Sequence, residues 1–316
     1  MSNEFEETFE TNYLAAPNMI VVATDLTDTA ELLPHAIAQA KASNSVLSIV
    51  HAIPANETFV PETGKVAYLD LDAEVRQAQM KMEPIMQDVS AQGIRCTATV
   101  RRGHPADVIA ELVRETGAQR VMVRTHGRTG VKRLLLGSTT RDVLTRIEVP
   151  VCTIGPHCLP PSGEGIRKVV HPTSLGPDCS IIARLALDLA QFHRAELTVL
   201  HVVSPDTAVE PYLDPHYAFE KLESLLPPKL ANMQTKVYKQ VVPGDVTKEI
   251  LRAAEEIHAD LIVLGVHPAS SRWALRKDES AYSVVTSALC PVLSFRTPEH
   301  EGKTAADSIH DVYVQG

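Results

Sequence analysis

Hydrophobic and polar positions follow two different periods along the first half of the chain. Short runs that are apolar at successive positions, such as Met19–Ala23 (MIVVA), are typical of strands covered on both faces. Longer segments with helical spacing lie between them; in 105–116 the apolar residues Val108, Ile109 and Leu112 fall on one helix face. The predicted strands are Met19–Ala23, Val46–His51, Ile94–Val100, Arg120–Val123 and Val149–Ile154, and the predicted helices are Thr29–Ser43, Asp70–Gln92, Pro105–Thr116 and Ser138–Arg146.

The second half of the chain repeats the first. Residues 103–123 align with residues 244–264, so that Gly103 matches Gly244 at an offset of 141 positions, and Val50-His51 matches Leu200-His201 at an offset of 150. A repeat of this length predicts a duplicated domain rather than a solenoid unit. We expect domains at 17–155 and 165–296, a proline-containing linker at 156–164, and flexible polar tails at 1–16 and 297–316.

The order of elements predicts the fold class. Strands that alternate with helices, with each strand apolar on both faces, favour an α/β fold in which each domain is a doubly wound parallel sheet. Ligands of such sheets bind at the carboxyl ends of the strands, where the strand order reverses. The loops after the first and fourth strands are therefore the places to look for a site.

Composition and charge narrow the range of functions. The chain has 316 residues, of which 44% are hydrophobic and 22% charged, and its formal charge of −9 disfavours nonspecific binding to nucleic acid or to an anionic membrane. It contains no apolar run long enough to span a membrane, and no secretory signal pattern. Its five cysteines form no CxxC pair. We therefore expect a protein of the reducing cytoplasm, without a disulfide framework or a bound metal.

The segment 124–146 (RTHGRTGVKRLLLGSTTRDVLTR) contains the strongest functional signal. Gly127 follows a predicted strand, and Gly137-Ser138 begins a predicted helix whose N-terminal N–H groups favour an anion. Thr139 and Thr140 add hydroxyl groups to the first turn of that helix. The segment has a local formal charge of +5, from Arg124, Arg128, Lys132, Arg133, Arg141 and Arg146 against Asp142. A polyphosphate ligand fits this pattern, although the same residues would also serve as a turn, a helix cap and a solvated surface.

With these residues the chain resembles a tandem universal stress protein of the UspA type. Nucleotide-binding members of that family have G-x2-G-x9-G-[S/T] after the fourth strand and an Asp at the end of the first; here these are THGRTGVKRLLLGS and the Asp25 of VVATD. The resemblance covers both halves of the chain and implies a Rossmann-like fold. It implies ATP as the ligand, with a divalent cation such as Mg2+ held chiefly by the phosphates.

The resemblance also implies roles for individual residues. Asp25 would contact the ribose or adenine, with Thr24 beside it; the alternative is that Asp25 is a polar strand-end or helix-capping residue. Leu47 would line the adenine pocket, and Val123 would lie at the ribose. The remaining positions would bind phosphate: Gly127 and Arg128 the α-phosphate, and Gly137, Ser138 and Thr139 the terminal phosphates.

Arg124 departs from the family pattern, because it stands where the first glycine of the motif belongs. Its guanidinium would either hold a phosphate or fill the pocket and block it. The sequence does not decide between these outcomes.

The second copy lacks the residues of the site. By alignment Asp25 becomes Thr173, Gly127 becomes Pro268, and Gly137-Ser138 becomes Asp278-Glu279. Proline has no N–H to donate, and two carboxylates would repel phosphate. We expect this copy to be a structural partner that forms an intramolecular pseudo-dimer through the fifth strands, Val149–Ile154 and Pro291–Phe295. Further homodimerisation of the whole chain stays open.

No catalytic motif accompanies the candidate site. The chain has no G-x-S-x-G, HExxH or G-x4-GK[ST] sequence, and no residue stands out as a nucleophile or general base. The sequence therefore predicts a nucleotide-binding regulatory protein of the stress response and not an enzyme. A nucleotide-free interaction module, with Arg124 in its pocket, is the alternative, and a weak ATPase is the third interpretation.

Overall fold

The computed structural model describes residues 16–54, 71–125, 137–176, 179–204, 214–226, 235–266 and 274–296. The first half contains strands β1 (Met19–Ala23), β2 (Val46–Ile53), β3 (Cys96–Arg102), β4 (Arg120–Arg124) and β5 (Val151–Ile154), and helices α2 (Thr29–Ser43), α3 (Leu71–Ala91), α4 (Pro105–Thr116) and α5 (Ser138–Arg146). The second half contains strands β6 (Lys168–Pro172), β7 (Glu196–Val203), β8 (Val237–Pro243), β9 (Leu261–Val266) and β10 (Val292–Arg296), and helices α6 (Cys179–His193), α7 (Pro215–Ser224), α8 (Val246–Glu256) and α9 (Ala274–Ser287).

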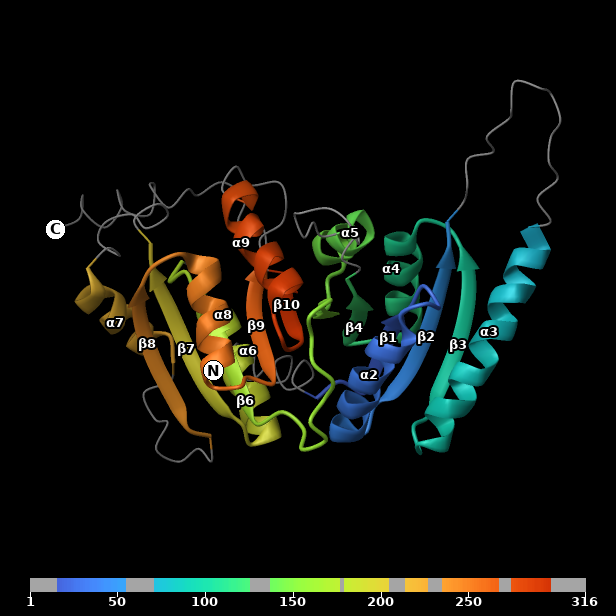
Figure 1. Ribbon diagram of the computed structural model, residues 1–316, viewed down its shortest axis with the longest axis horizontal. Coiled ribbons are helices and arrows are strands. Elements are labelled where there is room, and N and C mark those ends of the chain that lie inside the picture. The colour runs from blue at the N-terminus through green and yellow to red at the C-terminus, as the bar shows by residue number, and fades with distance from the viewer. Residues whose placement is uncertain are drawn as a thin grey trace, which may run out of the picture.

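The described strands form one continuous sheet that runs the length of the molecule (Figure 1). The strand order is β3-β2-β1-β4-β5-β10-β9-β6-β7-β8. Within each half all neighbouring strands are parallel, and β1 pairs with both β2 and β4. The order of strands therefore reverses between β1 and β4, as a doubly wound α/β fold requires.

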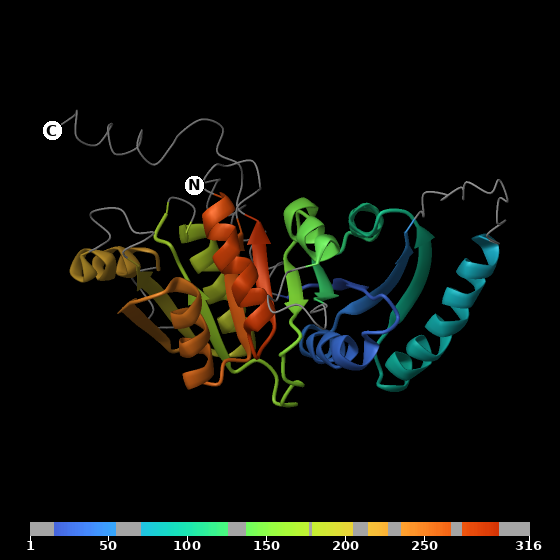
Figure 2. The same ribbon diagram turned by 45° about the horizontal axis from the view of Figure 1, so that its top comes forward.

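Helices cover both faces of the sheet (Figure 2) because successive strand residues point to opposite sides. In β1, Ile20 and Val22 join one hydrophobic cluster and Val21 joins the other. The first cluster includes side chains of α2, α3, α6 and α7, and the second includes side chains of α4, α5, α8 and α9. Each cluster spans both copies, so the two domains share their cores. None of the helices among these residues is long and apolar enough to cross a membrane.

Element boundaries follow the predicted pattern closely. Helices α2, α4 and α5 have the predicted limits, and so does β1. The fifth strand begins at Val151 and not at Val149, because Pro150 has no N–H to donate to the ladder and only its carbonyl bonds to β4, through the N–H of Val121 (3.0 Å). The third strand begins at Cys96 and not at Ile94, which is buried in the turn before it.

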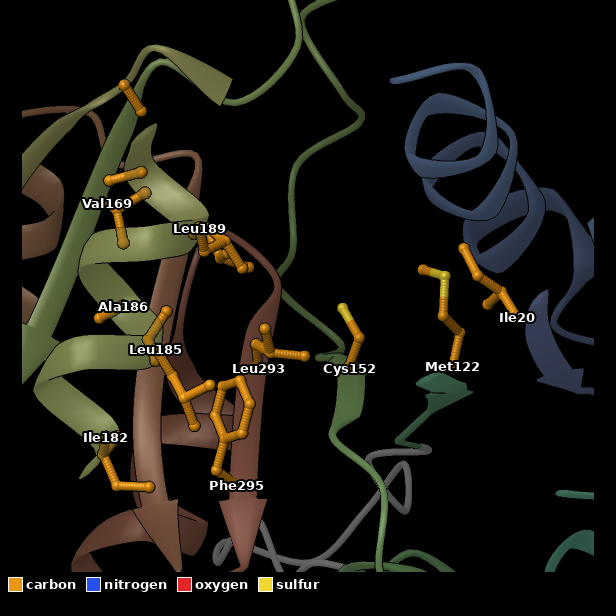
Figure 3. Packing of buried hydrophobic residues seen from close by; sticks show 14 of the residues in the cluster. Ile20, Met122, Cys152, Val169, Ile182, Leu185, Ala186, Leu189, Leu293 and Phe295 are labelled. Atoms are coloured by element: carbon orange, nitrogen blue, oxygen red, sulfur yellow. The ribbon is translucent and has the colours of Figure 1, made fainter. Parts of the chain in front are cut away.

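The two copies join through antiparallel pairing of β5 with β10, which confirms the expected intramolecular pseudo-dimer. Cys152 lies opposite Leu293, and the hydroxyl of Thr153 donates to the carbonyl of Val292 at 3.1 Å. Figure 3 shows Cys152 and Leu293 side by side on one face of this seam, with Phe295 and the apolar residues of α6 beyond them. Each of these central strands satisfies the edge of the other.

A buried polar group lies beside the seam on the α2 side of the sheet. Arg120 is 2% exposed and donates through Nη1 to Oε1 of Gln39 (2.9 Å), whose Nε2 in turn contacts the sulfur of Cys152 (3.2 Å). Burial lowers the pKa of Arg120 to about 10, which leaves it charged at neutral pH. Burial, and to a smaller extent this charge, lowers the pKa of His193 at the end of α6 to about 4.

Gly155, immediately after β5, allows α9 to approach the seam. A Cβ at this position would lie 2.7 Å from the carbonyl oxygen of Val285, closer than packed atoms tolerate. The absence of a side chain at residue 155 therefore fixes how closely the last turn of α9 packs on the first copy.

We predict that Gly155→Ala destabilises the protein by about 1–3 kcal/mol, because the added methyl group pushes α9 away from β5. The matched control is Gly137→Ala, where an added Cβ meets nothing within 4 Å. Urea denaturation measures both variants. Equal midpoints for Gly155→Ala and the unaltered chain would show that α9 is not held by this contact.

His171 in β6 is a buried histidine with no counterpart in the first copy, where Val22 stands at the equivalent position of β1. Its Nδ1 bonds to the carbonyl of Val263 at 3.0 Å, and burial lowers its pKa to about 4. The unfolded chain takes up this proton near pH 6.5, whereas the folded chain does so only near pH 4. The free energy of unfolding therefore falls as the pH drops through this window.

We predict that His171→Val, which copies the first domain, removes about 2–3 kcal/mol of the stability loss between about pH 7 and about pH 4.5. Urea unfolding of both proteins at the two pH values measures the difference. An unchanged pH dependence in the variant would mean that His171 titrates normally in the folded chain.

Candidate functional site

The carboxyl ends of β1 and β4 lie next to each other at the point where the strand order reverses. Ala23 pairs with Val123, so that Thr24, the first residue after β1, follows the rung next to Arg124, the last residue of β4. Thr24 is 6% exposed and Val123 is 5% exposed. The structure thus brings two of the predicted site residues, Thr24 and Val123, to one edge of the sheet.

Thr24 organises the turn between β1 and α2. Its hydroxyl accepts the N–H of Leu26 at 2.9 Å and donates to the carboxylate of Asp28. Leu26 adopts a positive φ of 70°, which makes the turn tight. Asp28 occupies the N-cap position of α2 but makes no side-chain bond to a helix N–H, because its carboxylate faces the Thr24 hydroxyl.

Asp25 is exposed in the same turn, and its orientation is fixed locally. Its Oδ1 accepts both the N–H and the hydroxyl of Thr27, each at 2.7 Å. This arrangement is an Asx turn, which presents the carboxylate at the carboxyl end of β1. The helix-capping role that we considered for Asp25 belongs by position to Asp28.

His51, at the carboxyl end of β2, also contacts this turn. Its Nδ1 bonds to the carbonyl of Thr24 at 2.9 Å, and His201 bonds in the same way to the carbonyl of Thr173 in the second copy. The shared contact confirms a structural role for these two histidines. His51 lies next to Thr24 because Val50, the residue before it, pairs with Ala23. In the sequence, His51 is recognisable as the polar residue that follows the apolar run of the second strand.

Leu47 does not lie at this edge. It is fully buried, pairs with Ile20 near the amino end of β1, and belongs to the core cluster under α2. Because Val50 is the β2 residue opposite Ala23, Leu47 sits three positions before the site end of its strand. We correct the expectation that Leu47 lines the pocket: the structure assigns it to the core.

The N-terminus of α5 has the features of an anion site. Gly137 is its N-cap, with no side-chain cap bond, and the first turn contains no acidic residue. The backbone of Gly137 is in an extended conformation that any residue adopts, and an added Cβ would meet none of the described residues within 4 Å. The described part of the fold therefore gives no reason for a glycine here. Thr139 is exposed in the same turn.

Three predicted site residues are not described, or are described only in part. Gly127 and Arg128 lie in 126–136, outside the described residues, and for Ser138 only the backbone is described. Ser138 is the first residue of α5, as predicted.

The three described arginines of the basic segment each contact another group. Arg124 is 16% exposed and lies 3.9 Å from the carboxylate of Glu31 on α2. Arg146 binds Asp107 of α4 at 2.8 Å. Arg141 lies over the ring of Tyr282 in the second copy, 5.3 Å from its centroid. These contacts give the arginines structural roles, so the local charge of +5 overstates what an anion would meet.

The turn after β6 in the second copy has the same backbone contacts as the turn after β1. The N–H of Thr173 donates to the carbonyl of Leu200, as the N–H of Thr24 does to the carbonyl of Val50, and the hydroxyl of Thr173 accepts the N–H of Leu175. Thr173 therefore corresponds to Thr24, which corrects the sequence alignment: the counterpart of Asp25 is Ser174.

Helix α9 also differs from α5 at its beginning. The repeat offset of 141 places Glu279 opposite Ser138, but α9 already begins at Ala274. The position equivalent to Gly137 is thus inside a helix, where backbone N–H groups bond within the helix and are not free for a ligand.

Within the described residues no group of three or more His, Cys, Asp or Glu side chains is arranged to hold a metal ion. The cysteines among them are all unpaired with one another.

Comparison with known proteins agrees with this architecture. The family model described as "Universal stress protein family" matches residues 18–154 and again residues 165–296. Universal stress protein MJ0577 of Methanocaldococcus jannaschii is 25% identical over 150 residues, which cover 43% of this chain and 93% of that protein.

Two solved structures align with most of the chain. A universal stress protein of Archaeoglobus fulgidus has a TM-score of 0.68 and 19% identity, over 88% of this chain and 98% of its own. Protein PA1789 of Pseudomonas aeruginosa, described as functionally unknown, has a TM-score of 0.60 and 15% identity, over 96% of this chain and 98% of its own. The matched residues establish that this chain belongs to the universal stress protein family and contains two of its domains in tandem.

Proposed function

We propose that the first domain binds one adenine nucleotide, ATP, and that the second domain binds none. The observation that carries the proposal is the first turn of α5, which has a glycine N-cap without a side-chain cap bond and no acidic residue, in the helix that follows β4 in the chain. Free N–H groups and the positive end of the helix dipole favour phosphate oxygens.

The nucleotide would lie along the edge formed by β1 and β4. Its adenosine part would contact the Thr24–Asp25 turn and Val123, and its phosphates would reach Gly137, Ser138 and Thr139, with Gly127 and Arg128 beside them. The spacing is supported by the register, since Ala23 and Val123 are paired and α5 follows β4 in the chain. A cation such as Mg2+ would be held chiefly by the phosphates.

The role that fits this site is regulatory. In the described part of the site, the hydroxyl of Thr24 lies beside the carboxylate of Asp28 and holds the turn after β1 together, so nucleotide binding would act by biasing conformation or association. The second domain would serve as the structural partner through β10. Cytoplasmic location and any homodimer of the whole chain belong to the same proposal.

We predict that the purified chain binds ATP in the micromolar range with one site per chain, measured by isothermal titration calorimetry. Gly137→Asp, which copies Asp278 of the second domain, should weaken binding at least about tenfold, because a carboxylate would face the phosphates. Gln92→Glu is the control: it adds the same charge at an exposed turn on the amino side of β3. Binding by Gly137→Asp as tight as by the unaltered chain would contradict the proposed site.

Arg124→Gly, which restores the family glycine, separates this proposal from the interaction-module alternative. Because Glu31 already lies beside the guanidinium on the α2 face, we expect no large change in ATP affinity. Binding that appears only in Arg124→Gly, and is absent from the unaltered chain at millimolar ATP, would favour the alternative in which Arg124 blocks the pocket.

A further inference from the structure

The helices α5 and α9 are equivalent elements of the two domains, and the seam places them next to each other (Figures 1 and 2). Both contribute to one hydrophobic cluster, through Val143 and Leu144 of α5 and Val284 and Val285 of α9. The helix proposed to hold phosphate therefore shares a hydrophobic cluster with its counterpart in the second domain, and the two helices touch through Arg141 and Tyr282.

One contact in this interface joins equivalent positions. Arg141 and Tyr282 are related by the repeat offset of 141, and the guanidinium carbon lies 5.3 Å from the ring centroid. A residue that touches its own equivalent lies close to the pseudo-twofold axis. In a symmetric pair of identical domains two arginines would meet here and repel each other. Because the tandem copies have diverged, the second supplies an aromatic ring that attracts the cation.

Tyr282 is held firmly on its own side. It is half-buried and packs against the shared hydrophobic cluster. Its carbonyl accepts the hydroxyl of Thr286 at 3.0 Å, and one turn further on Val285 is seated against Gly155. The side chain of Tyr282 thus packs on the cluster, while its backbone belongs to the helix that is seated against Gly155.

Arg141 links the ring of Tyr282 to the first turn of α5. Its backbone N–H donates to the carbonyl of Gly137 at 3.0 Å, which closes the first turn of α5. The opposite side of α5 is bound to the start of α4, where His104 lies 3.3 Å from Asp142 and Arg146 binds Asp107. A helix of nine residues is thus held from both sides, once by its own domain and once by the other.

We propose that Tyr282 of the second domain is a positioning residue for the anion site of the first. By holding Arg141, it fixes the first turn of α5 in the orientation that presents its N–H groups to phosphate. If the Arg141–Tyr282 contact favours phosphate binding, then by thermodynamic reciprocity a phosphate bound at Gly137 would stabilise that contact. Phosphate binding would therefore also restrain α9 at Tyr282. This inference rests on the proposed nucleotide site and gives the second domain a part in it.

The test compares Tyr282→Leu with Tyr282→Phe, which keeps the ring. Hydrogen–deuterium exchange of peptides covering 137–147 in the unliganded protein reads the order of α5, and calorimetry reads the ATP affinity. We expect Tyr282→Leu to increase exchange in α5 and to weaken ATP binding roughly two- to fivefold, the size of an exposed cation–π contact. Tyr282→Phe should show the same exchange in α5 and the same ATP affinity as the unaltered chain.

A cycle with Arg141→Leu tests whether the two residues act together. We expect the double variant to bind ATP no more weakly than either single variant, because each change removes the same contact. Thermal denaturation controls for a general loss of stability, which would raise exchange in all helices and would not be confined to α5.

The outcomes separate the two claims. If the unaltered chain binds no ATP, the proposed function is wrong, and exchange in α5 alone decides whether Tyr282 positions the helix. If the unaltered chain binds ATP while Tyr282→Leu changes neither affinity nor exchange in α5, the inference is wrong and the proposed function stands. Additive losses in the double variant would also overturn it.

Discussion

Antiparallel pairing of β5 with β10 is the interaction on which the rest of the structure depends. It joins two parallel sheets into one, satisfies the edge of each central strand, and allows each hydrophobic cluster to span both copies. It also places α5 against α9 and requires Gly155 where α9 approaches β5. The contacts of Arg141 with Tyr282 and of α9 with Gly155 lie on either side of this pairing and join the same two copies.

The tandem arrangement lets the two domains diverge in ways that a homodimer of identical chains does not allow. In the first domain α5 begins at Ser138, whereas α9 begins five residues before the position equivalent to Ser138. Val22 in one core is His171 in the other, and Arg141 meets Tyr282 and not a second arginine. These differences are the basis of the proposal that the first domain binds the ligand and the second supports it.

The sequence predicts most of the fold, because buried parallel strands and amphipathic helices leave clear periodic patterns. The site was harder to predict. The family resemblance places Leu47 in the pocket. How far Leu47 lies from the carboxyl end of the sheet depends on the register of β2 with β1, and the hydrophobic pattern does not reveal that register. The alignment of Thr173 with Asp25 failed because Thr24 and Thr173 share backbone contacts that only coordinates show. The roles of Asp28, Glu31 and Tyr282 depend on contacts across elements, which local sequence does not encode.

The central proposal is that, of the two domains, only the first offers phosphate the N-terminus of a helix. A crystal structure of the protein soaked with ATP tests this most directly. The claim predicts density for the phosphates at the first turn of α5, with adenosine toward the Thr24–Asp25 turn, and no nucleotide beside α9. Nucleotide bound at the second domain, or phosphates away from α5, would contradict it.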